Sequence, residues 1–316
     1  MEERARLNAN AQRRPDQRII QLLGGNQKHM KRRTASLFSM VCLLAAPLLA
    51  QPTIGGGTCN SGSLKGVYAV SLTSRQVTAS GTFTGVSQAN GSATFDGLSA
   101  VTISLVADTG QAVATPLTWS GTYSVQASCA GVITITAGGS ATLNVALYNS
   151  GADFLLSGSD ANSTYSGNGN TQPAGCSAST FSGVYTFNGT GFALTGTAVS
   201  GDDNGAGLLQ FDGVSRVTAN ITMTASGTPQ LALTLTGSYS ISSNCLGSAT
   251  LTDASKNSYV MTFSVYNSSV ANAGAYLGLA QSSIFLITGN AHAAYGQPAA
   301  TATAGQLGSA DRGGRA

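Results

Sequence analysis

Few side chains in this sequence have a type and spacing that could carry out catalysis. His292 is the only histidine after residue 50, and residues 51–316 contain no glutamate. A Ser-His-Asp site would have to use His292, and no nucleophile-elbow motif marks a serine partner for it. A glycosidase would need two aspartates, because both of its catalytic groups are carboxylic acids. The sequence therefore favours a non-enzymatic protein and indicates no cofactor, with an extracellular hydrolase as the least favoured alternative.

One pair of acidic residues is a weak candidate for a metal site. Asp202 and Asp203 are adjacent, in the Gly-rich segment at residues 200–205. Carboxylate oxygens are ligands that Ca²⁺ prefers, but the segment lacks the spacing of an EF-hand. A solvated turn is the favoured interpretation, and we expect no metal.

Aromatic side chains on predicted strands could line a pocket or a glycan-binding face. The possible ligand-lining residues are Tyr68, Trp119, Tyr123, Tyr185 and Tyr239. Packing in the core and at the barrel ends is the favoured interpretation, because these residues recur together with glycines of the repeat.

The first 50 residues have the pattern of an export leader. Residues 1–29 are polar and form either a disordered leader or a wrongly assigned start, and residues 30–50 resemble a signal peptide. The apolar run is too short to span a membrane, which takes ~20 residues. We therefore expect a secreted, periplasmic or cell-surface protein with no membrane span after cleavage.

Removal of this leader reverses the sign of the net charge. Of the 15 basic residues, 9 lie in residues 1–50, so residues 51–316 carry 6 basic and 9 acidic residues, a net charge of −3. Such a charge balance argues against nucleic acid as a partner.

The chain carries two copies of one unit. Gly121, Tyr123 and Cys129 match Gly237, Tyr239 and Cys245 at an offset of 116, and residues 95–97 (Phe-Asp-Gly) match residues 211–213 at the same offset. We also match residues 154–158 to residues 285–289, after an insertion around residues 270–281 that carries a weak helical pattern. The repeat divides the chain into a first domain at 51–168, a linker at 169–175, a second domain at 176–296 and a disordered tail at 297–316.

The cysteines fit this division. Cys59, Cys129, Cys176 and Cys245 lie behind the leader, an even number that indicates disulfides in an exported protein. If each copy folds alone, the pairs are Cys59–Cys129 and Cys176–Cys245.

Apolar residues alternate with polar ones throughout both copies, as at Leu143, Val145 and Leu147. This period indicates half-buried strands, and we expect about eight in each copy. Asp96-Gly97 and Asp212-Gly213 lie between such runs, which predicts tight hairpin turns of type I′. The sequence thus predicts an all-β protein of two tandem antiparallel barrel-like domains, with β-sandwiches as the alternative.

The order of motifs resembles a repeat found in uncharacterised exported bacterial proteins. The residues concerned are Leu64, Gly66, Tyr68, Phe95, Asp96, Gly97, Gly121, Tyr123, Cys129 and Gly131, with their partners in the second copy. The first copy departs from the pattern by having Ser120 where the second has Thr236. That group has no assigned activity, so the resemblance implies architecture and export only.

Three functions are compatible with these patterns, and the partner is unknown. A structural or surface-interaction role comes first, binding of a small apolar ligand or a surface glycan comes second, and hydrolysis comes last. The barrel interior separates the first two, because a ligand-binding barrel needs a cavity of several hundred Å³.

Overall fold

The computed structural model describes residues 58–109, 115–196, 198–225, 228–267, 274–281 and 284–294. The predicted signal peptide, the polar leader and the disordered tail lie outside the described residues. Residues 50–316 form one compact unit. Its described part consists of 16 strands and three short 3-10 helices, and none of these helices is long and apolar enough to cross a membrane.

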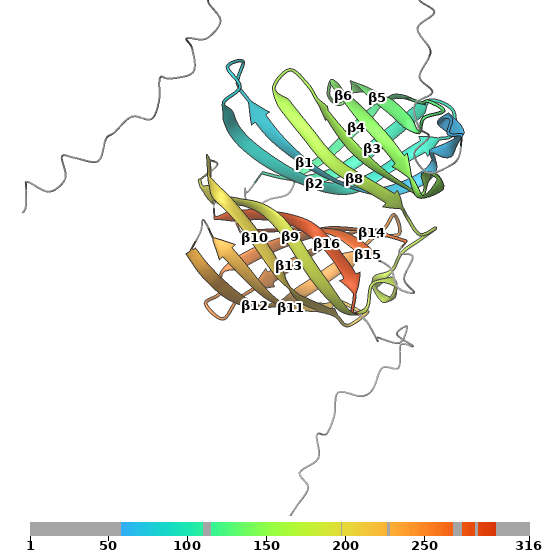
Figure 1. Ribbon diagram of the computed structural model, residues 1–316. Helices are drawn as coiled ribbons and strands as arrows, with labels where there is room; N and C mark the ends of the chain where they lie inside the picture. The colour runs from blue at the N-terminus through green and yellow to red at the C-terminus, as the bar shows by residue number, and fades with distance from the viewer. Residues whose placement is uncertain are drawn as a thin grey trace, which may run out of the picture. The chain divides into compact units, whose positions relative to one another are not determined.

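The first eight strands close into an antiparallel barrel (Figure 1), in which each strand pairs with the next and β8 returns to pair with β1. The strands are β1 Lys65–Val77, β2 Phe83–Asp96, β3 Ala100–Asp108, β4 Thr115–Val125, β5 Ala130–Ala137, β6 Ala141–Tyr148, β7 Asp153–Ser159 and β8 Ser163–Thr171. The 3-10 helices η1 (Ser61–Ser63) and η2 (Asn149–Gly151) lie outside these strands.

The second barrel has the same strand order, from β9 to β16, with β16 paired to β9. Its strands are β9 Gly183–Thr195, β10 Ala198–Phe211, β11 Arg216–Ala225, β12 Thr228–Ile241, β13 Leu246–Thr252, β14 Ser258–Tyr266, β15 Gly274–Gln281 and β16 Phe285–Ala293. The 3-10 helix η3 (Ala178–Thr180) precedes β9 as η1 precedes β1. The predicted all-β fold of two eight-stranded barrels is confirmed.

Alternation of side chains explains why these segments form barrel strands. In β6 every second residue is buried, beginning with Ala141 and ending with Leu147, and the residues between them are exposed. Side chains on a strand point alternately to its two faces, so one set fills the interior and the other faces outward. Each interior holds one cluster of buried apolar residues.

The last two strands of the two barrels do not correspond in the way that the sequence match between the two copies predicted. Residues 154–158 lie in β7, the seventh strand, whereas residues 285–289 lie in β16, the eighth. The strand equivalent to β7 is β15, which includes the described part of the predicted insertion. Its weak helical pattern was misleading, because β15 is buried at seven of its eight positions and therefore lacks the polar alternation of a half-exposed strand.

The boundary between the barrels also differs from the prediction. β8 continues to Thr171, three residues into the predicted linker, because Gly169, Asn170 and Thr171 pair with β1. The connection to β9 therefore begins at Gln172.

The two barrels contact each other through outward-facing side chains. Val86 of β2 packs with Phe192, Leu194, Ala280 and Leu286 of the second barrel. The Ser264 hydroxyl donates a hydrogen bond to the carbonyl of Gly91, at 2.6 Å, and Gln172 donates to the same hydroxyl. This contact buries polar as well as apolar groups on the outer faces of strands.

Candidate functional site

The five aromatic residues predicted as possible ligand-lining positions all lie on strands and are buried. Tyr68, Trp119 and Tyr123 belong to the core of the first barrel, and Tyr185 and Tyr239 belong to the core of the second. Tyr68 and Tyr123 pack edge-on against Phe95, and Tyr185 and Tyr239 pack edge-on against Phe211. The two barrels therefore use equivalent aromatic clusters as core.

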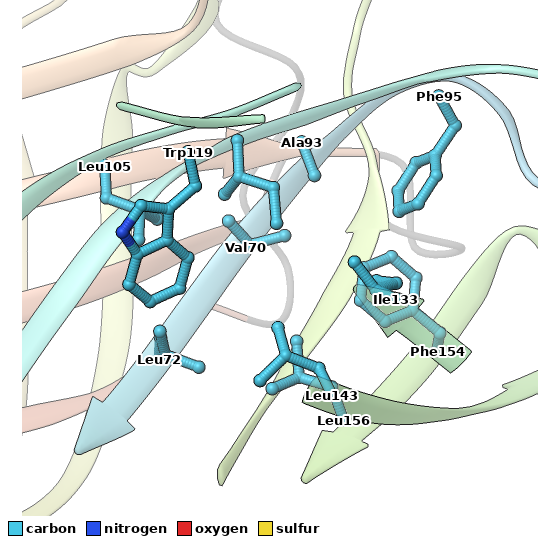
Figure 2. A pocket seen from close by; sticks show the side chains of 11 residues that line it. Val70, Leu72, Ala93, Phe95, Leu105, Trp119, Ile133, Leu143, Phe154 and Leu156 are labelled. Carbon is cyan, nitrogen blue, oxygen red and sulfur yellow. The ribbon is translucent and has the colours of Figure 1, made fainter. Parts of the chain in front are cut away.

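The interior of the first barrel is almost completely filled. Its cavity has a volume of about 10 Å³, which is the space that one water molecule needs. Figure 2 shows Trp119, Phe95, Phe154 and aliphatic side chains around this space. A pocket for a drug-sized ligand has roughly 300–1,000 Å³, so this interior holds no such ligand. The assignment of ligand contacts to the five aromatic residues stays a prediction.

The hydroxyls of the core tyrosines are already in use. Tyr123 donates to the carbonyls of Ser61 and Leu64, and Tyr239 donates to those of Ala178 and Phe181. Each pair of bonds ties the Gly-x-Tyr strand to the 3-10 helix at the start of its barrel. Burial, and then the charge of Asp212, raises the pKa of Tyr239 to about 12. These hydroxyls are therefore protonated at neutral pH and serve as structural donors.

The predicted disulfides are confirmed. Cys59 pairs with Cys129 and Cys176 pairs with Cys245, with Cα–Cα distances of 5.0 and 4.9 Å. Each bond joins the start of a barrel to the turn after its Gly-x-Tyr strand. Disulfides of this kind form in oxidising compartments such as the periplasm and the cell exterior.

The repeated Asp-Gly pairs lie in hairpins, but the turns differ from the predicted type. Gly97 has φ of +82°, whereas Asp96 ends β2 and is not among the residues with positive φ. One carboxylate oxygen of Asp96 accepts hydrogen bonds from the backbone N–H groups of Leu98, Ser99 and Ala100. Asp212 makes the same three contacts in the second barrel. The turn needs three residues after the aspartate, so a two-residue type I′ turn does not form.

The two aspartates of the acidic pair do not face each other. Asp202 and Asp203 lie inside β10, not in a loop, and neighbouring residues of a strand point to opposite faces. Asp203 is only 2% exposed, whereas Asp202 is exposed. Within the part of the chain that the structure describes, no three histidine, cysteine or acidic side chains gather closely enough to hold a metal ion.

His292 lies on the outside of β16 and is exposed. Its ring nitrogen Nδ1 is 3.4 Å from the hydroxyl of Tyr266. A tyrosine in this position supplies neither the serine nor the carboxylate that a triad requires.

A polar groove lies where the two barrels meet, and sequence reasoning missed it. One hollow of about 410 Å³ is lined by residues of β1, β2, β8, β9 and β10, and a second of about 250 Å³ by residues of β1, β8, β15 and β16. Both are lined by Thr73 and Ser166, so they adjoin at these two residues, and we call the two hollows together the inter-barrel groove. Amides, hydroxyls and charged groups dominate it, including Arg75, Gln88, Asn168, Asp202, Asn204 and Asn290. These residues resemble an ordinary solvated strand face in the sequence, so no motif could have indicated them.

The comparisons with known proteins add little to this picture. No family model matches the chain. No curated protein matches it either. Among solved structures, it is similar to the isotype 1 transferrin binding protein B from serogroup B Neisseria meningitidis, with 8% sequence identity and a TM-score of 0.24. The match covers 72% of this chain and 76% of that chain. A TM-score this low supports neither a shared fold nor a shared function.

Proposed function

We propose that this chain is an exported, non-enzymatic protein whose barrels act through their outer surface, in a structural or surface-interaction role. The observation that carries the proposal is the filled interior of the first barrel, whose cavity has a volume of only about 10 Å³. The second barrel supports it with an equivalent aromatic core, in which Phe181 and Leu209 are fully buried. With the interior of the first barrel filled and an aromatic core in the second, we expect a partner to bind on the outer faces.

The chemistry of the described residues supports a role without catalysis. The repeated tyrosines and aspartates make hydrogen bonds that hold helices and turns in place. The four cysteines that follow the leader are consumed in disulfides. The residues that recur in both copies therefore have structural tasks.

Cell fractionation tests the proposal. We expect the full chain, expressed in its source organism with a C-terminal tag, to reach the medium, the periplasm or the cell surface with both disulfides formed. N-terminal sequencing should find the mature chain beginning near Gln51. A full-length, reduced chain in the cytoplasm would contradict the proposal.

Native mass spectrometry of the purified protein separates this role from binding of a small apolar molecule inside a barrel. We expect the mass of the polypeptide alone. A stoichiometric apolar adduct that resists dilution would favour the alternative.

Glycan binding is the second candidate function, because the inter-barrel groove offers a polar surface of suitable size.

A further inference from the structure

Gln88 gives the inter-barrel groove a buried acceptor with no partner. This side chain is 2% exposed, and its amide nitrogen donates to the carbonyl of Thr190 at 3.5 Å. Its amide oxygen has no hydrogen-bond partner among the described residues. Buried polar atoms are normally satisfied, and an exception that lines a groove is a candidate contact for a water molecule or a ligand.

Arg75 supplies donors at the same end of the groove. Its guanidinium lies over the rings of Phe83 and Phe192, 5.4 and 5.0 Å from their centroids. A cation–π contact uses the face of the guanidinium and leaves the N–H groups around its edge available. Among the described residues no carboxylate lies within ion-pair distance of Arg75. The two rings therefore hold in place a planar group whose donors remain free for a ligand.

The charge of the groove argues against an anionic ligand. Asp202 faces the same hollow as Arg75, whereas the side chain of Asp203 points to the opposite face of β10, so the two formal charges in the hollow cancel. A phosphate, a nucleic acid or an acidic glycan would meet no excess of positive charge. The apolar surface is also too small for a lipid, since Phe192 and Tyr276 are the large aromatic residues that line the two hollows.

The remaining groups match a ligand that both donates and accepts hydrogen bonds along its length. Hydroxyls of Thr73 and Ser166 lie where the two hollows join, with Asn204 beside one and Asn168 beside the other. Hydroxyl and amide side chains can each donate and accept. Sugar hydroxyls have the same dual capacity. The two hollows have volumes of about 250 and 410 Å³. Their combined volume lies within the range of small-molecule sites, roughly 300–1,000 Å³.

We propose that the inter-barrel groove binds a neutral oligosaccharide of more than one sugar unit. Arg75 donates to sugar oxygens, and Gln88 and Asp202 accept from sugar hydroxyls. The second hollow, with Asn168 and Asn290, takes the next unit along the chain. This inference rests on the proposed surface-interaction role and identifies the class of partner.

Glycan binding by the purified, disulfide-bonded protein tests the proposal. A screen on an array of neutral glycans first identifies a probe. Titrations followed by ¹H–¹⁵N NMR then use maltotriose, cellotriose, chitotriose and mannotriose. Trigalacturonate serves as the anionic comparison. We expect at least one neutral glycan to shift the side-chain amide signals of Gln88, Asn168, Asn204 and Asn290. These signals come from both hollows, so they report on the whole groove.

Matched variants assign the binding to the groove. Arg75→Ala and Asn204→Ala should each weaken binding by about tenfold, the loss expected when one good hydrogen bond to a ligand is removed. Lys65→Ala removes a cation from the same strand outside the groove, and Asn220→Ala removes an exposed amide on β11. Both controls should change affinity less than about twofold, which corresponds to a free energy below RT. The unchanged dispersion of the other NMR signals shows that each variant is folded.

Three results would overturn the proposal. The first is that no neutral glycan binds, either on the array or in the titrations. The second is that the NMR signals that shift all belong to residues outside the groove, and the third is that trigalacturonate binds more tightly than any neutral glycan. Each leaves the fractionation result untouched, so failure of the groove is distinguishable from failure of the proposed export and surface role.

Discussion

At the scale of single residues, Asp96 and Asp212 explain why Phe-Asp-Gly recurs in both barrels. The three backbone N–H groups around each carboxylate favour its charged form. The bond from Leu98 is the largest influence and lowers the pKa of Asp96; desolvation opposes it, and the bonds from Ala100 and Ser99 lower the pKa further, so the net direction is downward. For Asp212 burial is the largest single influence and acts upward, but the N–H groups of Arg216, Val214 and Ser215 outweigh it, so its pKa is also lowered.

A pH dependence of stability follows from these lowered pKa values. A carboxyl whose pKa is lower in the folded state stabilises the fold fully above its unfolded pKa, about 3.9. This stabilisation is lost as the pH falls through the folded-state pKa. We expect the double variant Asp96→Asn, Asp212→Asn, which keeps an acceptor oxygen but removes the charge, to melt below the wild type at pH 7. The difference should shrink between pH 4 and pH 2.

Thermal unfolding followed by circular dichroism, with the disulfides intact, measures this difference. Asp160→Asn serves as control, because that carboxylate caps a hairpin with one backbone N–H group only. An equal deficit of the double variant at pH 7 and at pH 2.5 would show that the charge of the two aspartates does not contribute.

The sequence predicted some residue roles and missed others for a physical reason. The disulfide pairing followed from the repeat, because each cysteine has one equivalent and each barrel closes on itself. The position of Asp96 in a hairpin was predicted, but its role as acceptor for three N–H groups was not. Asp-Gly suits several hairpin loops, and the length of the loop, set by where β2 and β3 begin to pair, selects the turn type.

At the scale of the strand, the glycine of the Gly-x-Tyr motif allows two strands to approach closely. A Cβ atom on Gly237 of β12 would lie 2.0 Å from the carbonyl oxygen of Thr250 in the neighbouring strand β13, and Gly121 faces the same obstacle at Thr134. The tyrosine two residues later, Tyr239, donates to the carbonyl of Ala178 in η3 from the same strand, so a shift of this strand would also move that hydroxyl.

Gly237→Ala should therefore destabilise the second barrel by about 1–3 kcal/mol, the usual cost of forcing an extra methyl group into a packed region. Gly205→Ala is the matched control, since a Cβ there would lie 3.4 Å or more from its nearest neighbours. We expect the control to leave stability unchanged or to raise it by up to about 1 kcal/mol, through a more restricted unfolded chain. Urea unfolding curves of both variants give the two free energies, and an equal loss in both would contradict the role of close approach.

The number of strands was predictable because alternation of side chains is a local property, whereas alternation alone left closed barrels and sandwiches as alternatives. The order of the last strands was not predictable, because β15 is buried on both faces. Its outward-facing residue Tyr276 packs with Tyr266 and with Ala69 of the first barrel. A strand covered in this way has no polar face to mark its period.

At the scale of the whole molecule, the contact between the barrels creates the candidate site. Gln88 and Asn90 point outward from β2, where an isolated barrel would expose them to water, yet they are 2% and 3% exposed. Nothing in their local sequence distinguishes them from solvated residues. Which outer face is covered depends on how two closed surfaces fit together, so the inter-barrel groove could be found only from the structure.

The apolar part of this contact should couple the unfolding of the two barrels. Val86 is 6% exposed and packs with Phe192, Leu194 and Leu286 from the second barrel. Val86→Asp places a carboxylate in this cluster, and a buried charge without a partner is strongly unfavourable. The interior of each barrel is untouched, so we expect both to remain folded while the contact opens. Leu208→Asp is the control, because Leu208 is 49% exposed on the outside of β10.

Differential scanning calorimetry of the disulfide-bonded protein tests this coupling. We expect one transition for the wild type and for Leu208→Asp, and two for Val86→Asp, because barrels that no longer touch unfold independently. The same variant should lose binding of any glycan that the groove holds, since β1 and β2 of one barrel and β9 and β10 of the other must meet to form it. A single, unshifted transition for Val86→Asp would show that this cluster does not couple the unfolding of the two barrels. In that case the substitution should leave glycan binding unchanged.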